Sequence, residues 1–147
     1  HDHPDRRVDM RLGSIEFTES GVEMPRSATF EDFEQAIMAV AIFRRASPMW
    51  LGRLALEGQR RFGDKFWSML TTCDASLEDL HRLAGVCDKV SQLNWNARLS
   101  MTHHQFAATL PPHIQKAALQ QAADEGLNSG EFRNLCAAIR KGFGGRS

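Results

Sequence analysis

The chain has few cysteines and no long apolar run. Its 147 residues include three cysteines, Cys73, Cys87 and Cys136, which lie far apart and form no Cys-x-x-Cys pair. An odd number without a paired motif argues against a disulfide framework and favours a reducing compartment. No apolar run approaches the roughly 18 residues of a membrane span, and the charged N-terminal residues are unlike a signal peptide. We therefore expect a cytoplasmic protein that does not enter a membrane.

Signatures of catalysis and of cofactor binding are also missing. The sequence has no glycine-rich phosphate loop and no nucleophile in a glycine-flanked turn. His103 and His104 are adjacent, but neighbouring residues of a helix point about 100° apart and rarely bind one ion. No second cluster stands at ligand spacing. We expect no metal, no cofactor and no enzymatic activity.

The net charge is zero, but the charges are unevenly distributed. Residues 1–34 hold nine acidic and four basic side chains, a formal charge of −5, and residues 35–147 hold nine and fourteen, a charge of +5. The N-terminal residues are therefore acidic and the rest of the chain is basic. This pattern gives mild support to a nucleic-acid partner.

The first third of the chain predicts a hairpin and two helices. Residues 12–24 alternate apolar and polar around a Glu-Ser-Gly turn, which is typical of a short β-hairpin. Thr29 and Asp32 have the spacing of a capping box before a helix from 30 to about 45. Ser47 and Pro48 then indicate a new helix start, running to about residue 62. The expected buried side chains are Phe30, Phe33, Ile37, Val40 and Ile42 in the first helix and Trp50, Leu51, Leu54 and Leu56 in the second.

Residues 64–90 predict two amphipathic helices joined by a tight polar turn. Phe66, Trp67 and Leu70 cover the first helix, and a leucine stripe that begins at Leu77 lines the second. Ser76 is placed to cap the second helix. Two short helices held at a fixed angle form a helix-turn-helix, which lets one helix lie in the DNA major groove.

The remaining residues predict three more helices. A short capped helix covers 99–110, a second follows the proline pair at 111–112, and a turn at 126–129 with a capping serine, Ser129, leads to a last helix over 130–141. The fold class is therefore all-α: a multi-helix domain that contains a helix-turn-helix, with a short N-terminal β-hairpin. The expected parts are an added or disordered segment (1–9), the hairpin and linker (10–28), a helical dimerisation part (29–63), a DNA-binding part (64–141) and a flexible tail (142–147).

The order of these elements resembles two families. The second half is similar to the DNA-binding domain of the ParB/KorB partition proteins, on the strength of the 76–90 helix, Leu-Ser-Met-Thr-His at 99–103, the 114–125 helix and Gly-Leu-Asn-Ser-Gly-Glu-Phe-Arg at 126–133. The whole chain resembles small LmbU-like regulators of bacteria and phages, through Trp-Leu-Gly at 50–52, Arg-Phe-Gly-Asp-Lys at 61–65 and the Leu-Ser-x-x-His-His element at 99–104. These resemblances imply a helical, sequence-specific, dimeric DNA-binding protein. The nucleotide-binding domain of the partition proteins has no counterpart in the chain, so nucleotide binding is not implied.

The 77–90 helix is the first candidate reader of DNA. Arg82 can donate two hydrogen bonds to a guanine edge, and His81 can reach a base or a phosphate. Thr72 and Ser76 stand near the helix N-terminus, where a phosphate can bind, and Lys89 lies near its end. Its two carboxylates, Glu78 and Asp79, would repel the phosphate backbone unless one accepts from a cytosine amino group. The alternative is a plain packing helix.

The two last helices form a second candidate. Ala122 and Gly126 occupy places where a helix-turn-helix needs small residues, and the side chains that would then face DNA are Arg133, Asn134, Arg140 and Lys141. A third group, which would bind phosphates without choosing a sequence, comprises Arg44, Arg45, Arg53, Arg60, Arg61 and Lys65. The alternative for this group is a solvated helix face.

These features favour double-stranded DNA as the partner and a homodimer as the assembled form. The predicted function is transcriptional regulation or replication and partition control in a bacterium, plasmid or phage. A protein-interaction adaptor or inhibitor is the alternative, since the acidic N-terminus suits a protein surface. A phage small terminase subunit is a further DNA-binding possibility.

Overall fold

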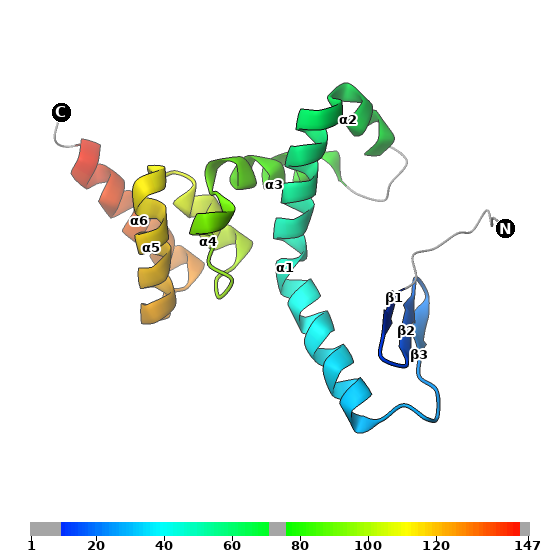
Figure 1. Ribbon diagram of the computed structural model, residues 1–147. Coiled ribbons are helices and arrows are strands. Elements are labelled where there is room, and N and C mark those ends of the chain that lie inside the picture. Colours follow the sequence, from blue (N-terminus) through cyan, green and yellow to red (C-terminus); the bar gives the residue numbers. More distant parts are fainter. Residues whose placement is uncertain (1–9, 71–75, 145–147) are drawn as a thin grey trace. The chain divides into compact units, whose positions relative to one another are not determined.

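The computed structural model describes residues 10–70 and 76–144, without the side chains of 143 and 144. Helices predominate, with a small antiparallel sheet at the N-terminal end (Figure 1). The elements are β1 Met10–Leu12, β2 Ile15–Thr18, β3 Gly21–Glu23, α1 Phe30–Phe62, α2 Asp64–Leu70, α3 Leu77–Lys89, a 3-10 turn Gln92–Asn94, α4 Met101–Ala107, α5 Pro112–Glu125 and α6 Ser129–Gly144. The predominantly helical fold with an N-terminal β element is confirmed. The chain forms two compact units, residues 1–45 and 46–147.

The first unit contains the sheet and the start of α1. The predicted hairpin is the β2–β3 pair, with Thr18 opposite Gly21, and the sequence missed a third strand, β1, which pairs with β2. Gly13 makes the β1–β2 turn possible with its φ of +62°, a value that few other residues adopt. The predicted capping box is confirmed, because Asp32 accepts from the Thr29 N–H (3.1 Å) and donates its own N–H to the Thr29 hydroxyl (3.0 Å). The hydroxyl of Ser14 also donates to Asp32 (2.7 Å) and lowers the pKa of that carboxyl.

The predicted helix break at Pro48 is wrong, because α1 runs unbroken from residue 30 to 62. Proline lacks the N–H that would bond the carbonyl four residues earlier, which here is that of Arg44. Arg44 is exposed, so water can bond that carbonyl in place of the proline. The helix continues through Gly52 and Gly58, and Ala46, Ser47 and Met49 around the proline are half-buried.

The buried face predicted for residues 30–45 is also wrong. Phe30 is 82% exposed, Ile37 69% and Phe33 41%, and the other two expected core residues, Val40 and Ile42, are exposed as well. Among the described residues of this stretch, the one buried apolar side chain is that of Ala36. The periodicity identified an apolar face, but none of the residues that the structure describes buries it.

In the second unit, the later half of α1 packs through its smallest residues. Gly52, Ala55 and Gly58 are buried, whereas the expected core residues Trp50, Leu51 and Leu54 are exposed and Leu56 is half-buried. A Cβ on Gly52 would stand 2.7 Å from the Leu83 carbonyl oxygen and from the Cys87 sulfur, and one on Gly58 would meet the Phe66 ring. Helix α1 therefore packs through its glycine and alanine face rather than through its leucine face, because only residues with small side chains let another helix come this close.

Helix α3 connects two hydrophobic clusters of the second unit. Its first half contributes Leu80 and Ala84 to a cluster with Ala55 and Leu70, and its second half contributes Val86 and Val90 to the larger cluster formed with α4–α6. The predicted cap is confirmed, since the Ser76 hydroxyl accepts from the Asp79 N–H. Leu77, expected to begin the stripe, is exposed.

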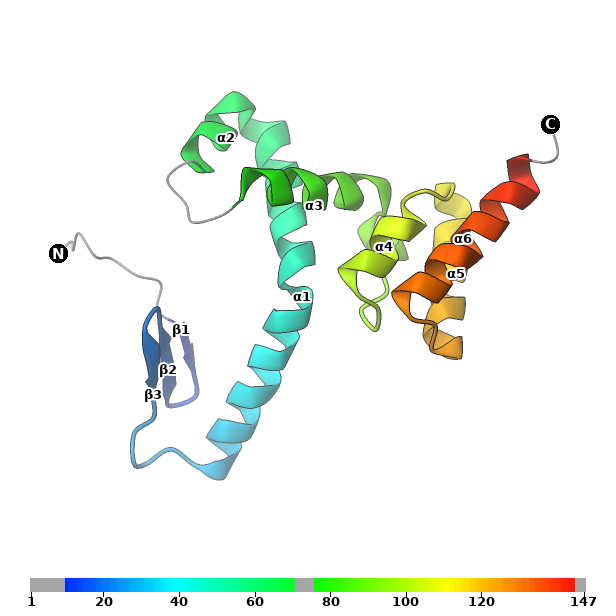
Figure 2. The same cartoon turned by 180° about the vertical axis from the view of Figure 1, so that it is seen from behind.

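Helices α4, α5 and α6 lie beside one another (Figure 2). They share one hydrophobic core, in which Leu119, Phe132 and Cys136 are fully buried. The predicted helix over 99–110 is shorter, beginning after its cap at Ser100. Asn128, rather than the predicted Ser129, caps α6, in a reciprocal pair with Glu131 at 2.8 and 2.9 Å. The amide oxygen of Asn128 reaches the N–H three residues on, and Ser129 is already helical. The last helix extends to Gly144, beyond its expected end at residue 141.

His104 is fully buried in this core and is held in its neutral form. Its Nδ1–H donates to the Ser100 carbonyl (2.7 Å), its Nε2 accepts from the Asn96 N–H (3.0 Å), and its ring stacks on Trp95 at 3.6 Å between centroids. A second proton on Nε2 would place two donors face to face. Burial is the main cause that lowers the pKa of His104, to about 4.

Two substitutions of helical glycine test the α1–α3 crossing. We expect Gly52→Ala to lower the free energy of unfolding by about 1–3 kcal/mol, because its methyl group would collide with α3. Gly85→Ala is the matched control on α3, since a Cβ there meets nothing within 4 Å; better helix propensity should raise stability by about 0.5–1 kcal/mol. Urea denaturation of both variants measures the difference, and equal effects would contradict the crossing.

The buried histidine predicts a dependence of stability on pH. Above pH 6.5 both folded and unfolded chains keep His104 neutral, so its contribution is complete. Below pH 6.5, His104 binds a proton in the unfolded chain but stays neutral in the folded chain down to about pH 4. The free energy of unfolding should therefore fall by about 3 kcal/mol as the pH is lowered from 6.5 to 4. Denaturant titrations over that range measure the loss, and His104→Gln should flatten it while the exposed control His113→Gln should not. A wild-type NMR titration that gives His104 an ordinary pKa would contradict the prediction.

Candidate nucleic-acid interface

The exposed edge of α3 carries the first set of predicted contacts. The His81 ring stacks on Trp67 at 3.8 Å between centroids. Arg82 lies 3.6 Å from the Asp79 carboxylate and donates to the Gln105 side chain at 3.3 Å. Glu78 and Asp79 are exposed beside them, as the sequence led us to expect. The edge is therefore as acidic as it is basic, and its arginine already has partners.

The other α3 candidates are placed unequally. The Ser76 hydroxyl is used in capping at 3.2 Å from the Asp79 nitrogen. Lys89 is exposed at the end of the helix. Thr72 lies outside the described residues, as does the turn predicted between α2 and α3.

The arginines of α1 that belong to the second unit already have partners. Arg53 donates to the carbonyls of Cys87 and Val90 (3.0 Å each), so it stabilises the C-terminus of α3, where unpaired carbonyls carry partial negative charge. Arg60 pairs with Asp88 at 3.1 Å, and Arg61 with Glu57 at 2.7 Å. Lys65 on α2 is exposed. Arg44 and Arg45 belong to the first unit.

Helices α5 and α6 are joined by a short, well-defined turn. Gly126 adopts the left-handed conformation, with φ 65° and ψ 35°, and the Leu127 N–H bonds back to the Ala122 carbonyl at 2.9 Å. Ala122 is 0% exposed and belongs to the hydrophobic core. Gly126 is exposed, and a Cβ there would meet nothing within 4 Å. The close approach predicted for Gly126 is therefore wrong, and the turn needs glycine for its left-handed backbone instead.

His103 fastens the same turn from α4. Its Nε2 lies 2.9 Å from the Leu127 carbonyl oxygen, to which it can donate, while its Nδ1 contacts Ser100. The expectation that this histidine packs or caps is confirmed, but its contact with the α5–α6 turn was not foreseen. The Ser-x-x-His spacing signals a cap, and no pattern in the sequence gives the distant carbonyl.

One face of α6 presents polar side chains to solvent. Arg133, Asn134, Ala137, Arg140 and Lys141 are all exposed, and their i, i+1, i+4, i+7, i+8 spacing places them on one side of a helix. Arg140 donates to the Thr109 hydroxyl at 2.7 Å. In the described parts of the chain, Arg133 and Lys141 have no carboxylate partner. We call this surface the α6 face.

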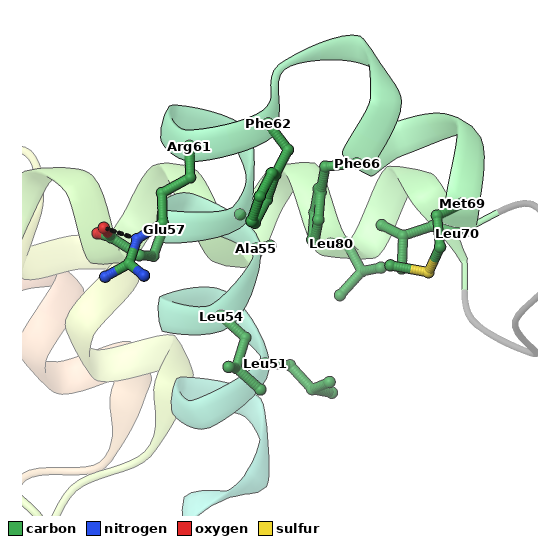
Figure 3. Close-up of a pocket in the computed structure, with 11 residues that line it drawn as sticks. Leu51, Leu54, Ala55, Glu57, Arg61, Phe62, Phe66, Met69, Leu70 and Leu80 are labelled. Carbon is green, nitrogen blue, oxygen red and sulfur yellow. Dashed lines mark hydrogen bonds and ion pairs between the residues drawn. The ribbon is translucent and has the colours of Figure 1, made fainter.

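An apolar groove lies elsewhere in the second unit. It has a volume of about 600 Å³, and Leu51, Leu54, Phe62, Phe66 and Met69 are among the side chains that line it (Figure 3). The Glu57–Arg61 ion pair stands at its rim, and Arg61 lowers the pKa of that carboxyl. The hydrophobic periodicity assigned these leucines to the core, so the groove was not predicted.

Chemistry-bearing groups do not converge in the structure. Within residues 10–70 and 76–144, no three His, Cys, Asp or Glu side chains gather as a metal site requires. Cys87 and Cys136 are buried thiols, and burial raises the pKa of Cys136 to about 11, so neither is a ready nucleophile. No helix in the described ranges is both long and apolar enough to cross a membrane.

Comparison of the chain with protein-family models, with curated proteins and with solved structures found no match. The geometry described above is therefore the basis for assigning a function.

Proposed function

We propose that this protein binds double-stranded DNA in a sequence-specific manner and acts as a regulator of transcription, replication or partition. Helices α5 and α6 form its helix-turn-helix, and α6 lies in the major groove. The observation that carries the proposal is the tight corner at Gly126, which presents the α6 face to solvent while the opposite side of α6 is buried through Phe132 and Cys136.

The side chains of the α6 face suit a DNA groove. Arginine can donate two hydrogen bonds to guanine, and asparagine can pair with adenine in the same way, so Arg133 and Asn134 are the proposed base contacts. Arg140 and Lys141, two turns further along, are placed for phosphates. Ala137 lies between these two pairs of residues on the helix, and its small side chain leaves room for the edge of the DNA major groove.

Electrostatics favour α6 over α3 as the reader. The exposed residues of α3 include Glu78, Asp79 and Asp88, which would face phosphates at close range. On α6, the described acidic residue is Glu131, which is held in the capping pair with Asn128. This choice revises the order of the two candidates that the sequence suggested.

Selection of bound duplexes from a random DNA pool tests the proposal directly. We expect one enriched motif, with binding to it that weakens steeply as salt rises, since contacts to phosphates release counterions. Fluorescence anisotropy with the selected and a scrambled duplex measures both properties. A pool without enrichment, together with equal binding of the two duplexes, would rule out sequence-specific recognition.

Variants of the two helices locate the reader. Arg133→Ala and Asn134→Ala should each weaken binding to the selected duplex by about 1–3 kcal/mol, and each should relax preference at one base position. Lys141→Ala should weaken binding to all duplexes equally and reduce the salt dependence. Arg82→Ala on α3 is the matched control and should have little effect. If Arg82→Ala abolishes binding and Arg133→Ala does not, α3 is the reader instead.

The apolar groove favours a second candidate function, that of a protein-interaction adaptor or inhibitor. Its exposed side chains, such as Leu54 at 67% and Phe62 at 59%, suit the apolar side of a partner helix. Extract treated with nuclease should then yield one stoichiometric protein with the wild-type chain and none with Leu54→Glu. Retention of that protein by Leu54→Glu would exclude the groove as its site.

A further inference from the structure

We propose that a second copy of this chain docks, antiparallel, on the exposed apolar face of residues 30–45. This N-terminal α1 face comprises Phe30, Phe33, Ile37 and Val40, and Met38 is exposed at its edge. The proposal concerns assembly of the first unit and does not rest on DNA binding.

The spacing of the face identifies its partner as a helix. Phe30, Phe33, Ile37 and Val40 follow the a and d positions of two heptads, the pattern by which one helix packs along another. The sheet does not occupy this side of α1, since its hydrogen bond to the helix is made by Ser14 with Asp32, and Ala36 is the buried apolar residue.

The exposed apolar area supplies a large part of what self-association requires. The four side chains of the face and Met38 at its edge are between 41% and 82% exposed, which amounts to on the order of 500 Å² of apolar surface per copy when an aromatic side chain offers about 150–250 Å². A stable interface buries roughly 800 Å² on each partner. The flanking charged side chains can supply the remainder.

Charge complementarity selects a copy of this chain in the antiparallel direction. The face is acidic at its start, through Glu31 and Glu34, and basic at its end, through Arg44 and Arg45. Glu34 and Arg45 lie on the same edge of the helix but about three turns, roughly 16 Å, apart, so they cannot pair within one chain. A twofold axis between residues 39 and 40 brings Glu34 of each copy against Arg45 of the other, as an isologous interface requires.

The oligomeric state of the full chain, without DNA, tests the proposal. Sedimentation equilibrium should give twice the mass of one chain for the wild type and the mass of one chain for Ile37→Asp. Leu54→Asp is the matched control, because Leu54 is similarly exposed (67% against 69%) on the later half of the same helix, and it should remain dimeric. A wild-type chain that sediments as a monomer at all concentrations would overturn the proposal, as would loss of the dimer in Leu54→Asp alone.

Charge reversal distinguishes a second copy from another partner and fixes its direction. Glu34→Arg and Arg45→Glu should each raise the dissociation constant of the dimer at least about tenfold, because each places like charges across the interface. The double variant should restore it, since the reversed charges meet again. Circular dichroism confirms that helix content is unchanged. Failure of the double variant to recover the dimer would overturn the antiparallel arrangement.

Discussion

The close crossing of α1 and α3 is the contact on which the second unit depends. Because Gly52 has no side chain, the backbone of α1 can approach the backbone of α3 closely. The neighbouring Arg53 donates to the carbonyls of Cys87 and Val90 at the end of α3, and its guanidinium lies 5.4 Å from the centre of the Trp95 ring. Gly52 and Arg53, in one turn of α1, therefore hold α3 in place: the glycine leaves room for it, and the arginine bonds its C-terminal carbonyls. Since α3 contributes to both hydrophobic clusters, its position sets that of the α4–α6 core.

The Ser-x-x-His-His element at residues 100–104 makes a second set of contacts that hold the helices of this unit together. Ser100 starts α4, His103 contacts the Leu127 carbonyl at the corner of α5 and α6, and His104 bonds the backbone of Asn96. Both imidazoles act as shaped hydrogen-bonding groups inside a core. Their proximity in sequence suggests metal binding, but the two rings bond to different segments, His103 to Leu127 and His104 to Asn96. The proposed reading helix owes its orientation to these contacts.

Elements with local signals could be predicted from the sequence, and long-range packing could not. Caps at Thr29, Ser76 and Ser100 follow from hydrogen bonds within one turn, so their spacing reveals them. Whether a leucine such as Leu54 is buried depends on which helix packs against its side of α1. In this protein the other helices pack against Gly52 and Gly58, so Leu54 stays exposed although its hydrophobicity predicted a core position. For the candidate site, the turn at Gly126 could be recognised because a left-handed residue favours glycine, although the size argument made for it was wrong. The partners that occupy Arg53 and Arg82 come from distant parts of the chain.

Pro48 gives α1 an unusual internal property. The helix is continuous in geometry, yet one rung of its hydrogen-bond ladder is missing beside the boundary between the two compact units. Helical cooperativity passes from residue to residue through that ladder, so a missing rung lets the two halves open separately. Amide protons before the proline should then exchange with solvent at rates set by the small first unit, and those after it at the slower rates of the α3-bound segment. A single helix can in this way belong to two folding units.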